Sequence, residues 1–299
     1  METRSTITTA QLEEFSKLQR IENRSKITKK ILRNKGTVTG IVLLFIIFFL
    51  AIFGPMIVPF GYAEMGPNIL AAPSATHPFG TDIFGRDTFS RTLHAAATSL
   101  TIAMSATLIS TVIGVTFGMI SGYYGKMTDR IILGINDVFL AIPVLLFAVC
   151  IIAIFGRGTF VSIIAISAAF LPSSLRIARG QVLTLKQREF VLALKSMGIS
   201  DFQIIFKHLL PNVMAPVIVM ATISVGFGVM VEASLAYIGM GVPIPGASLG
   251  SLVMEGRPFI MTHWWISALP GLFIAVIVMG FNLVGDGLRD VSDYHDIMK

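Results

Sequence analysis

Charged side chains are scarce in this sequence. Asp, Glu, Lys and Arg together make up 13% of its 299 residues, about half of the roughly 25% that soluble domains carry. Hydrophobic residues make up 54%, and the mean hydropathy is +0.78. They gather in runs of about 20 residues, long enough to cross a bilayer as helix, and the alternating short segments of a transmembrane β-barrel are missing from the sequence. The composition predicts an all-α membrane protein.

Cysteine and metal-binding patterns are also nearly missing. Cys150 is the only cysteine, so it can form no intramolecular disulfide, and it lies in an apolar run where a cysteine usually packs as a small hydrophobic residue. The H-E-x-x-H metal motif is absent, and the five histidines have no ligand-like spacing. We therefore expect this chain to hold no metal and no cofactor of its own.

A phosphate-binding loop is missing as well. The closest approach is Gly125-Lys126-Met127, but Ile120 stands where the first glycine belongs and Met127 where Ser or Thr belongs. Asp286 lies in a G-D-G triplet that invites comparison with intramembrane aspartyl proteases, yet those need G-x-G-D and position 283 is Leu. We predict that the chain is not an enzyme and carries neither an ATPase nor a hydrolase site.

Six apolar segments are long enough to span a membrane. A polar stretch, residues 1–37, precedes the first of them and is too long for the start of a secretory signal, so we interpret the first segment as an uncleaved anchor. The spans are predicted at 38–59, 95–121, 131–154, 160–178, 213–238 and 264–286.

The basic residues are distributed unequally between the two sides of these spans. Of the 23 Lys and Arg residues, nine lie in residues 1–37, two after the second span, six after the fourth and two at the C-terminus, which leaves four on the other side. Because Lys and Arg mark cytoplasmic loops, both termini are predicted to be cytoplasmic. The same distribution explains the formal charge of +6 without nucleic-acid binding.

The second span carries glycines at four-residue spacing. Gly114, Gly118 and Gly122 form a smooth face that permits close helix packing, either within the chain or against a partner subunit. Outside the membrane, residues 60–94 form a long external segment and 239–263 a Gly/Pro-rich one.

Residues 181–212 form the only sizeable internal stretch that is helical in pattern yet too polar to span. Gly198 is a natural stop for a first helix, Ser200 can cap a second, and Pro211 is expected to break that second helix before the fifth span. The pattern predicts a cytoplasmic helix–turn–helix. Glu189 and Asp201 among its lysines favour a docking site for a protein partner over a helix lying on lipid headgroups, where the polar face is mostly cationic.

At this point the residues carry a resemblance to permease subunits of ATP-binding-cassette importers. Glu189, Ala193, Gly198 and Leu210-Pro211-Asn212 resemble the E-A-A–x3–G–x9–L-P signature of those subunits. Four further blocks, in order, resemble the C-type permease of the dipeptide/oligopeptide family; they are HPFGTDIFGRDTFSR (77–91), SGYYGKMTDRIILGINDVFLAIP (121–143), EASLAYIGMGVPIP (232–245) and FNLVGDGLRD (281–290). The second alanine of the signature is replaced by Leu194, and an external aromatic of the family by Leu249, which we expect to affect the substrate-side contact.

The resemblance implies a fold, a mechanism and a set of partners. It implies the type I importer permease fold, with a transmembrane permease domain at 38–290, a coupling loop at 179–212 and a cytoplasmic tail at 291–299. It implies ATPase-coupling residues in a helix pair at 186–211, namely Glu189, Ala193, Gly198, Leu210 and Pro211. The implied partners are a homologous second permease, two ATPase subunits that bind ATP and Mg, and an extracytoplasmic substrate-binding protein, in a bacterial or archaeal cytoplasmic membrane.

The implied substrates are dipeptides or oligopeptides, although family members also import glutathione, nickel or metal chelates. A secondary transporter or channel normally shows two inverted halves, and the sequence has no internal repeat of this kind. Two acids lie within apolar spans, Asp137 and Glu232. Intramembrane carboxylates are candidates for function, including proton coupling, and a hydrogen bond to a neighbouring helix explains them equally well.

Overall fold

The computed structural model describes residues 34–297, with side chains described as far as Val291. The predicted N-terminal segment 1–37 therefore lies outside the described residues except for its last four. The principal helices are α2 (Lys35–Ile57), α3 (Thr88–Tyr124), α4 (Lys126–Leu140), α5 (Val144–Phe155), α6 (Thr159–Leu185), α7 (Glu189–Ser196), α8 (Asp201–Gln203), α9 (Leu210–Tyr237), α10 (Leu249–Gly256) and α11 (Trp265–Ile297). A π-helical turn, Ile204–Leu209, joins α8 to α9, and α11 extends through most of the predicted tail 291–299.

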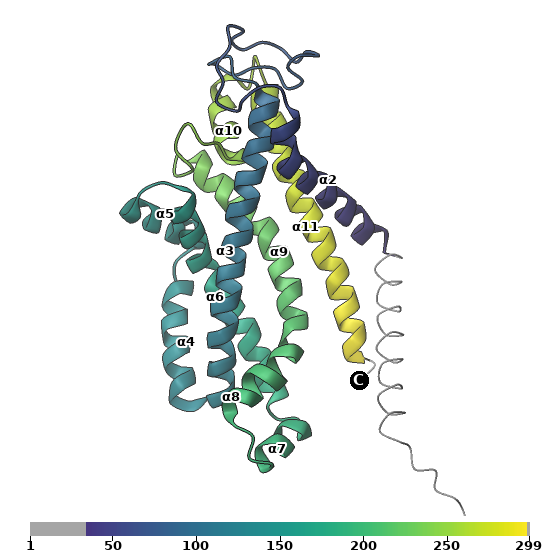
Figure 1. Cartoon of the computed structure of the whole chain (residues 1–299). Coiled ribbons are helices and arrows are strands. Elements are labelled where there is room, and N and C mark those ends of the chain that lie inside the picture. The colour runs from purple at the N-terminus through teal and green to yellow at the C-terminus, as the bar shows by residue number, and fades with distance from the viewer. Residues whose placement is uncertain (1–33, 298–299) are drawn as a thin grey trace, which may run out of the picture.

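Five helical stretches of the described chain are long and apolar enough to cross a membrane. They are α2, α3, α6, the continuous run Asp201–Tyr237 and the first 27 residues of α11. These stretches coincide with five of the six predicted spans, and several continue beyond the apolar segment. Figure 1 shows α3 running the length of the molecule, with α10 and the external loops at one end and α7 at the other.

The third predicted span, 131–154, is not one straight helix. The chain forms α4 and α5 instead, and they are bent by 87° at residues 141–143. Pro143 explains the break, because it has no backbone N–H to continue the helix and it disfavours helical backbone at the residue before it. The two pieces count as a sixth span only if the bent pair crosses the membrane together.

The small-residue face of α3 packs within the chain. A side chain at Gly114 would lie 2.6 Å from the Ser174 Cβ, and one at Gly122 would lie 3.0 Å from the Arg179 carbonyl oxygen. An added Cβ at Gly118 would collide with the Leu175 carbonyl oxygen. All three contacts are with α6, so the glycine repeat serves the α3–α6 pair rather than a partner subunit.

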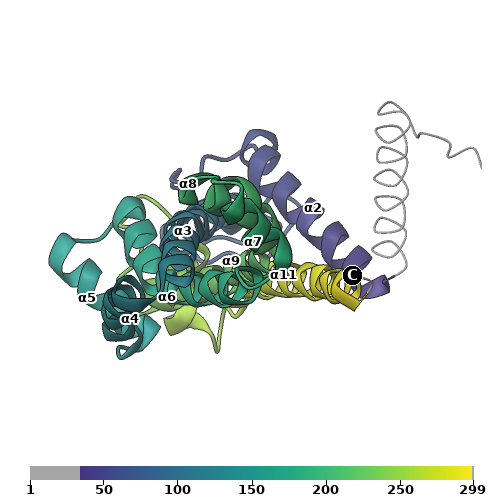
Figure 2. The same ribbon diagram turned by 90° about the horizontal axis from the view of Figure 1, so that it is seen from below.

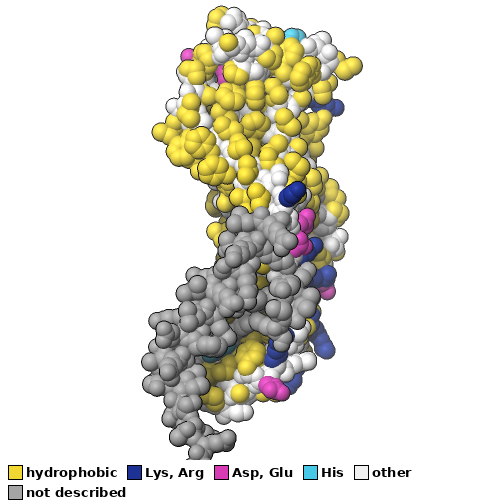
Figure 3. Space-filling model, turned by 90° about the vertical axis from the view of Figure 1, so that its right-hand side faces the viewer, with side chains coloured by type: hydrophobic (Ala, Val, Ile, Leu, Met, Phe, Trp, Pro, Cys, Tyr) yellow, Lys and Arg dark blue, Asp and Glu magenta, His cyan; other side chains and the backbone are white. Residues whose placement is uncertain are grey.

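Four of the other helices lie on two sides of this pair. Figures 1 and 2 show α4 and α5 on one side and α2 and α11 on the other. On the face seen in Figure 3, hydrophobic side chains form a broad band over the upper part of the molecule, and Lys, Arg, Asp and Glu gather below it. Large apolar side chains such as Phe45, Leu108 and Phe227 are exposed on the spanning helices, as expected where lipid or another subunit covers them.

Candidate functional site: the coupling segment and the outer cap

The polar segment forms a helix–turn–helix at one end of the molecule. The turn follows α7, where the Gly198 N–H donates to the Lys195 carbonyl at 3.0 Å and the Ile199 N–H to the Leu194 carbonyl at 3.2 Å. This pair of bonds is the Schellman arrangement, which requires a left-handed residue after the helix. Gly198 supplies it with a φ of +75°, a conformation that glycine adopts without the strain that most other residues would incur.

The second half of the segment differs from the sequence prediction. Pro211 does not break the helix, because α8, the π-helical turn and α9 run continuously from Asp201 to Tyr237. The wider π turn includes a bond from the Leu210 N–H to the Ile205 carbonyl, and the Asn212 side-chain amide donates to the His208 carbonyl at 2.8 Å. The side chain of Asn212 thus satisfies a carbonyl beside the proline, which itself cannot donate.

The predicted cap of this helix is also wrong in its chemistry. Ser200 occupies the N-cap position, but its side chain makes no capping hydrogen bond. Its carbonyl instead accepts from the Ile204 N–H at 3.0 Å. The start of the second helix is held by Asp201, whose carboxylate accepts a hydrogen bond from the Tyr123 hydroxyl at 2.6 Å.

One face of residues 186–211, which we call the coupling segment after the motif they resemble, is fixed to the ends of the spanning helices. Val191, Ile204 and Leu209 have no exposed surface and pack in one cluster with residues of α3, α6 and α9, including Tyr123 and Val182. This packing makes the two short helices extensions of three long ones, so that a push on one is transmitted to the others.

The other face of the segment is exposed. Glu189, Ala193, Gly198 and Pro211 are exposed, and Leu210 is half-buried. Four large apolar side chains share that exposure, with exposed fractions of 39% for Phe190, 55% for Leu192, 73% for Met197 and 70% for Phe202. A rigid exposed surface with apolar side chains and mixed charge is typical of a protein-interaction site. Leu194, in contrast, is half-buried and packs into the cluster beneath.

Ionic contacts brace α4 against α3 and α6 beside this segment. The Arg179 guanidinium donates two hydrogen bonds to the Asp129 carboxylate, both at 2.7 Å, and Ser121 donates to the same carboxylate. Lys186 donates to the Gly122 carbonyl at 2.7 Å. The sequence analysis identified these residues only as topology signals or as parts of a family block. The brace is visible only in the tertiary structure, because Asp129 and Arg179 lie 50 residues apart in the chain.

The opposite end of the molecule carries a buried ionic cluster, which we call the outer cap. Arg91 donates to both carboxylate oxygens of Glu255, at 3.1 and 2.9 Å, and Arg86 donates to Glu255 at 3.0 Å and to Asp82 at 2.6 Å. Both arginines are almost fully buried. The cluster ties the external loop before α3 to α10, and the sequence prediction missed it although it quoted the block that contains Asp82, Arg86 and Arg91.

Asp87 is the N-cap residue of α3 in the same region. Its carboxylate accepts from the Ser90 N–H at 2.6 Å and contacts the His77 ring nitrogen at 2.9 Å. Helix α3 therefore begins at Thr88, so the predicted external segment 60–94 includes the first seven residues of the helix.

Leu249, expected to affect an external contact, is completely buried. It packs in the cluster that contains α2, α3 and α11, and its N–H donates to Ser99 at 3.1 Å. The expectation was wrong because Leu249 begins α10, which folds inward beneath the external loops. The presence of Leu249 where the family has an aromatic residue therefore affects packing in the core.

The two intramembrane acids lie in different environments. Glu232 is 2% exposed and accepts a hydrogen bond from the Ser99 hydroxyl at 2.7 Å, which links α9 to α3. Asp137 is exposed in this chain and pairs with Arg176 of α6 at 2.8 Å. In the residues that the structure describes, neither acid belongs to a group of three His, Cys, Asp or Glu that could hold a metal ion.

The arrangement defines the fold of an importer permease. It is similar to the solved structures of the MetNI methionine ABC transporter in inward-facing conformations, with a TM-score of 0.52 and 22% identity over 65% of this chain and 93% of that chain. The model of the family described as "binding-protein-dependent transport system inner membrane component" matches residues 114–294. The model described as "N-terminal TM domain of oligopeptide transport permease C" matches residues 25–73.

Relatives of full length agree with the family models. The dipeptide transport system permease protein of Alkalihalophilus pseudofirmus is 39% identical, covering 89% of this chain and 88% of its own. The oligopeptide transport system permease protein of Bacillus subtilis is 40% identical, covering 87% of this chain and 86% of its own. The di/tripeptide transport system permease protein of Pseudomonas aeruginosa is 37% identical, covering 87% of this chain and 88% of its own. The chain belongs to the family of binding-protein-dependent transport inner-membrane components, as its motifs indicated.

Proposed function

We propose that this chain forms half of the translocation path of an ATP-driven peptide importer and couples to a separate ATPase through residues 186–211. The exposed face of the coupling segment carries this proposal. It presents Leu192, Met197 and Phe202 to the surroundings, while its other face is fixed to α3, α6 and α9. A docked partner that moves this segment moves three spanning helices with it.

The partners follow from what this chain would need to work. One permease makes half a path, so a homologous second permease supplies the rest, and two ATPase subunits bind ATP and Mg. An extracytoplasmic binding protein delivers the substrate at the side of the outer cap. Binding of ATP draws the two coupling segments together and opens the path outward, and release after hydrolysis returns it inward.

Orientation and substrate complete the proposal. Both termini are cytoplasmic, supported by the Lys and Arg distribution of the sequence. Peptides are the proposed substrates, because the relatives are named for dipeptide, oligopeptide and di/tripeptide transport. Glutathione, nickel and metal chelates are the alternatives, and uptake assays on the reconstituted complex separate them.

Loss of ATPase docking tests the coupling face directly. Leu192→Glu places a charge on the exposed face, and we expect the cognate ATPase subunits no longer to co-purify with the permease pair. Met127→Glu is the matched control, since Met127 is at least as exposed as Leu192 and lies at the start of α4, outside the segment. Equal ATPase recovery from both variants, or peptide uptake without ATP, would contradict the proposal.

A further inference from the structure

A cavity of about 380 Å³ lies between α9, α11 and α6. Five of its seven lining residues come from α9, among them Met220 and Ile223, and α6 contributes Ile177. Ser224 is one of only two polar side chains in the lining, and its hydroxyl donates to the Met220 sulfur at 3.2 Å. The wall of the cavity is therefore almost entirely apolar.

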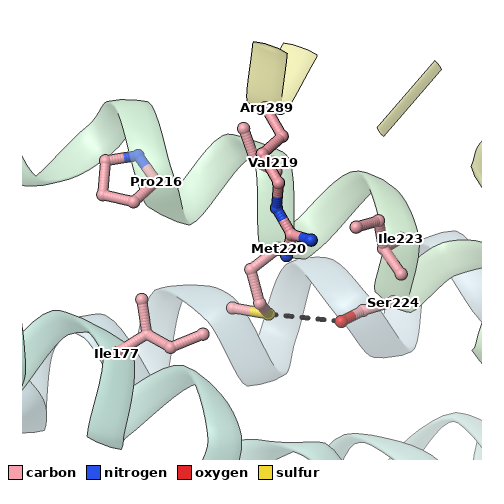
Figure 4. Close-up of a pocket in the computed structure, with 7 residues that line it drawn as sticks. All are labelled: Ile177, Pro216, Val219, Met220, Ile223, Ser224 and Arg289. Atoms are coloured by element: carbon pink, nitrogen blue, oxygen red, sulfur yellow. Dashed lines mark hydrogen bonds between the residues drawn. The ribbon is translucent and has the colours of Figure 1, made fainter. Parts of the chain in front are cut away.

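Arg289 of α11 supplies the charge of this cavity. Figure 4 shows its side chain extending from α11 toward Met220 and Val219, so that the guanidinium lies over the apolar wall. Among the side chains that the structure describes, no hydrogen bond or ion pair engages this guanidinium. A guanidinium presents parallel N–H donors that match phosphate or carboxylate oxygens.

The position of Arg289 along α11 corresponds to the depth of lipid headgroups. Residues 265–285 carry no charged side chain, and their helical rise of about 30 Å equals the thickness of the bilayer hydrocarbon. Asp286 is the first charged residue after them, and Arg289 follows one turn later. On the face seen in Figure 3, charged side chains likewise begin where the hydrophobic band ends.

We propose that this cavity binds an anionic phospholipid from the membrane leaflet on the side of the coupling segment. The lipid phosphate accepts hydrogen bonds from Arg289, and an acyl chain lies along Ile177, Met220 and Ile223. Basic pockets between membrane helices on the cytoplasmic side take acidic headgroups in this way. A zwitterionic peptide fits the cavity less well, because none of the described residues that line it is an Asp or Glu that could pair with the peptide ammonium group.

The bound lipid connects two moving parts of the molecule. Helix α9 is continuous with the π-helical turn of the coupling segment, whereas Arg289 belongs to α11. A lipid in the cavity contacts residues of both helices, so we expect anionic lipid to influence coupling. This inference concerns lipid and is independent of the proposed substrate.

Lipid retention by the complete transporter complex tests the proposal. The complex is incubated with vesicles of phosphatidylglycerol or of phosphatidylcholine, and the bound lipid is counted by native mass spectrometry. We expect selective phosphatidylglycerol retention that falls about fivefold in Arg289→Gln, as for the loss of one basic contact, and survives in Arg289→Lys. Arg130→Gln is the matched control, because Arg130 is exposed on α4 and lines no part of the cavity.

A second variant tests the acyl-chain wall. Ser224→Leu places a larger side chain in the cavity and so reduces its free volume without removing Arg289. We expect it to lower phosphatidylglycerol retention as well, which keeps the test decisive if Arg289→Gln does not fold. Equal retention of the two lipids, or equal losses in Arg289→Gln and Arg130→Gln, would overturn the proposal. Displacement of the lipid by a dipeptide or tripeptide would also overturn it and make the cavity a substrate contact.

Discussion

Replacement of Gly198 tests whether the coupling segment acts as a rigid lever. Gly198 has a φ of +75°, and a Cβ built on it meets nothing within 4 Å. The effect of a substitution is therefore confined to the backbone conformation, which costs an L-residue about 1–2 kcal/mol in the left-handed region and more for a β-branched one. A change of this size lowers the equilibrium ratio of intact to altered turn about 5- to 30-fold.

The substitutions form a graded series. Gly198→Asn should keep near-normal transport because Asn tolerates the left-handed conformation, Gly198→Ala should be intermediate, and Gly198→Val should hydrolyse ATP with little uptake. The measurement is the ratio of peptide taken up to ATP hydrolysed in proteoliposomes that contain the complete complex. Gly180→Ala is the matched control, since its surroundings are equally open and its backbone is helical. Equal ratios for Asn, Ala and Val at position 198 would refute the reasoning.

Three further substitutions probe the parts that support the lever. Arg91→Met leaves Glu255 and Asp82 in the outer cap without one partner. This should lower the free energy of unfolding by about 3 kcal/mol and lower the melting temperature of the solubilised chain. Arg257→Met, at an exposed site of the same end, should leave the melting temperature unchanged. Gly118→Val should abolish monodisperse protein after solubilisation, because its side chain would collide with the Leu175 carbonyl, while Gly134→Ala in open space should be tolerated. Tyr123→Phe removes the hydrogen bond to Asp201 but keeps the aromatic ring beneath Lys195. Loss of 1–2 kcal/mol should accelerate amide hydrogen exchange across residues 189–209 about 5- to 30-fold. Tyr124→Phe should leave the exchange rate unchanged.

Local chemistry explains which sequence predictions were confirmed. The apolar runs predicted six spans, and five of them coincide with continuous spanning helices, because about twenty apolar residues form a helix long enough to cross the bilayer hydrocarbon. Gly198 was predicted to end a helix, and it does so in the left-handed conformation that glycine alone adopts without cost. In both cases the determining interaction lies within a few residues of the chain.

The wrong predictions concern residues whose effect depends on their neighbours in space. Pro211 was expected to break a helix, but a π turn and the Asn212 side chain accommodate it. Pro143 was not expected to break one, and there the chain bends by 87°. The same residue type thus has opposite consequences, because only at Pro211 is the preceding turn held in place by buried contacts of Ile204 and Leu209 with α3, α6 and α9.

The sequence by itself determined that the chain is a helical membrane protein, that it carries short blocks resembling those of importer permeases, and to which family it belongs. These properties depend on composition and on short ordered blocks, which remain legible without coordinates. The tertiary structure alone decided that the glycines of α3 face α6, that Leu249 is buried, and that Arg86 and Arg91 meet Glu255. Each of these contacts joins segments far apart in the chain, and the sequence of either segment does not specify its partner.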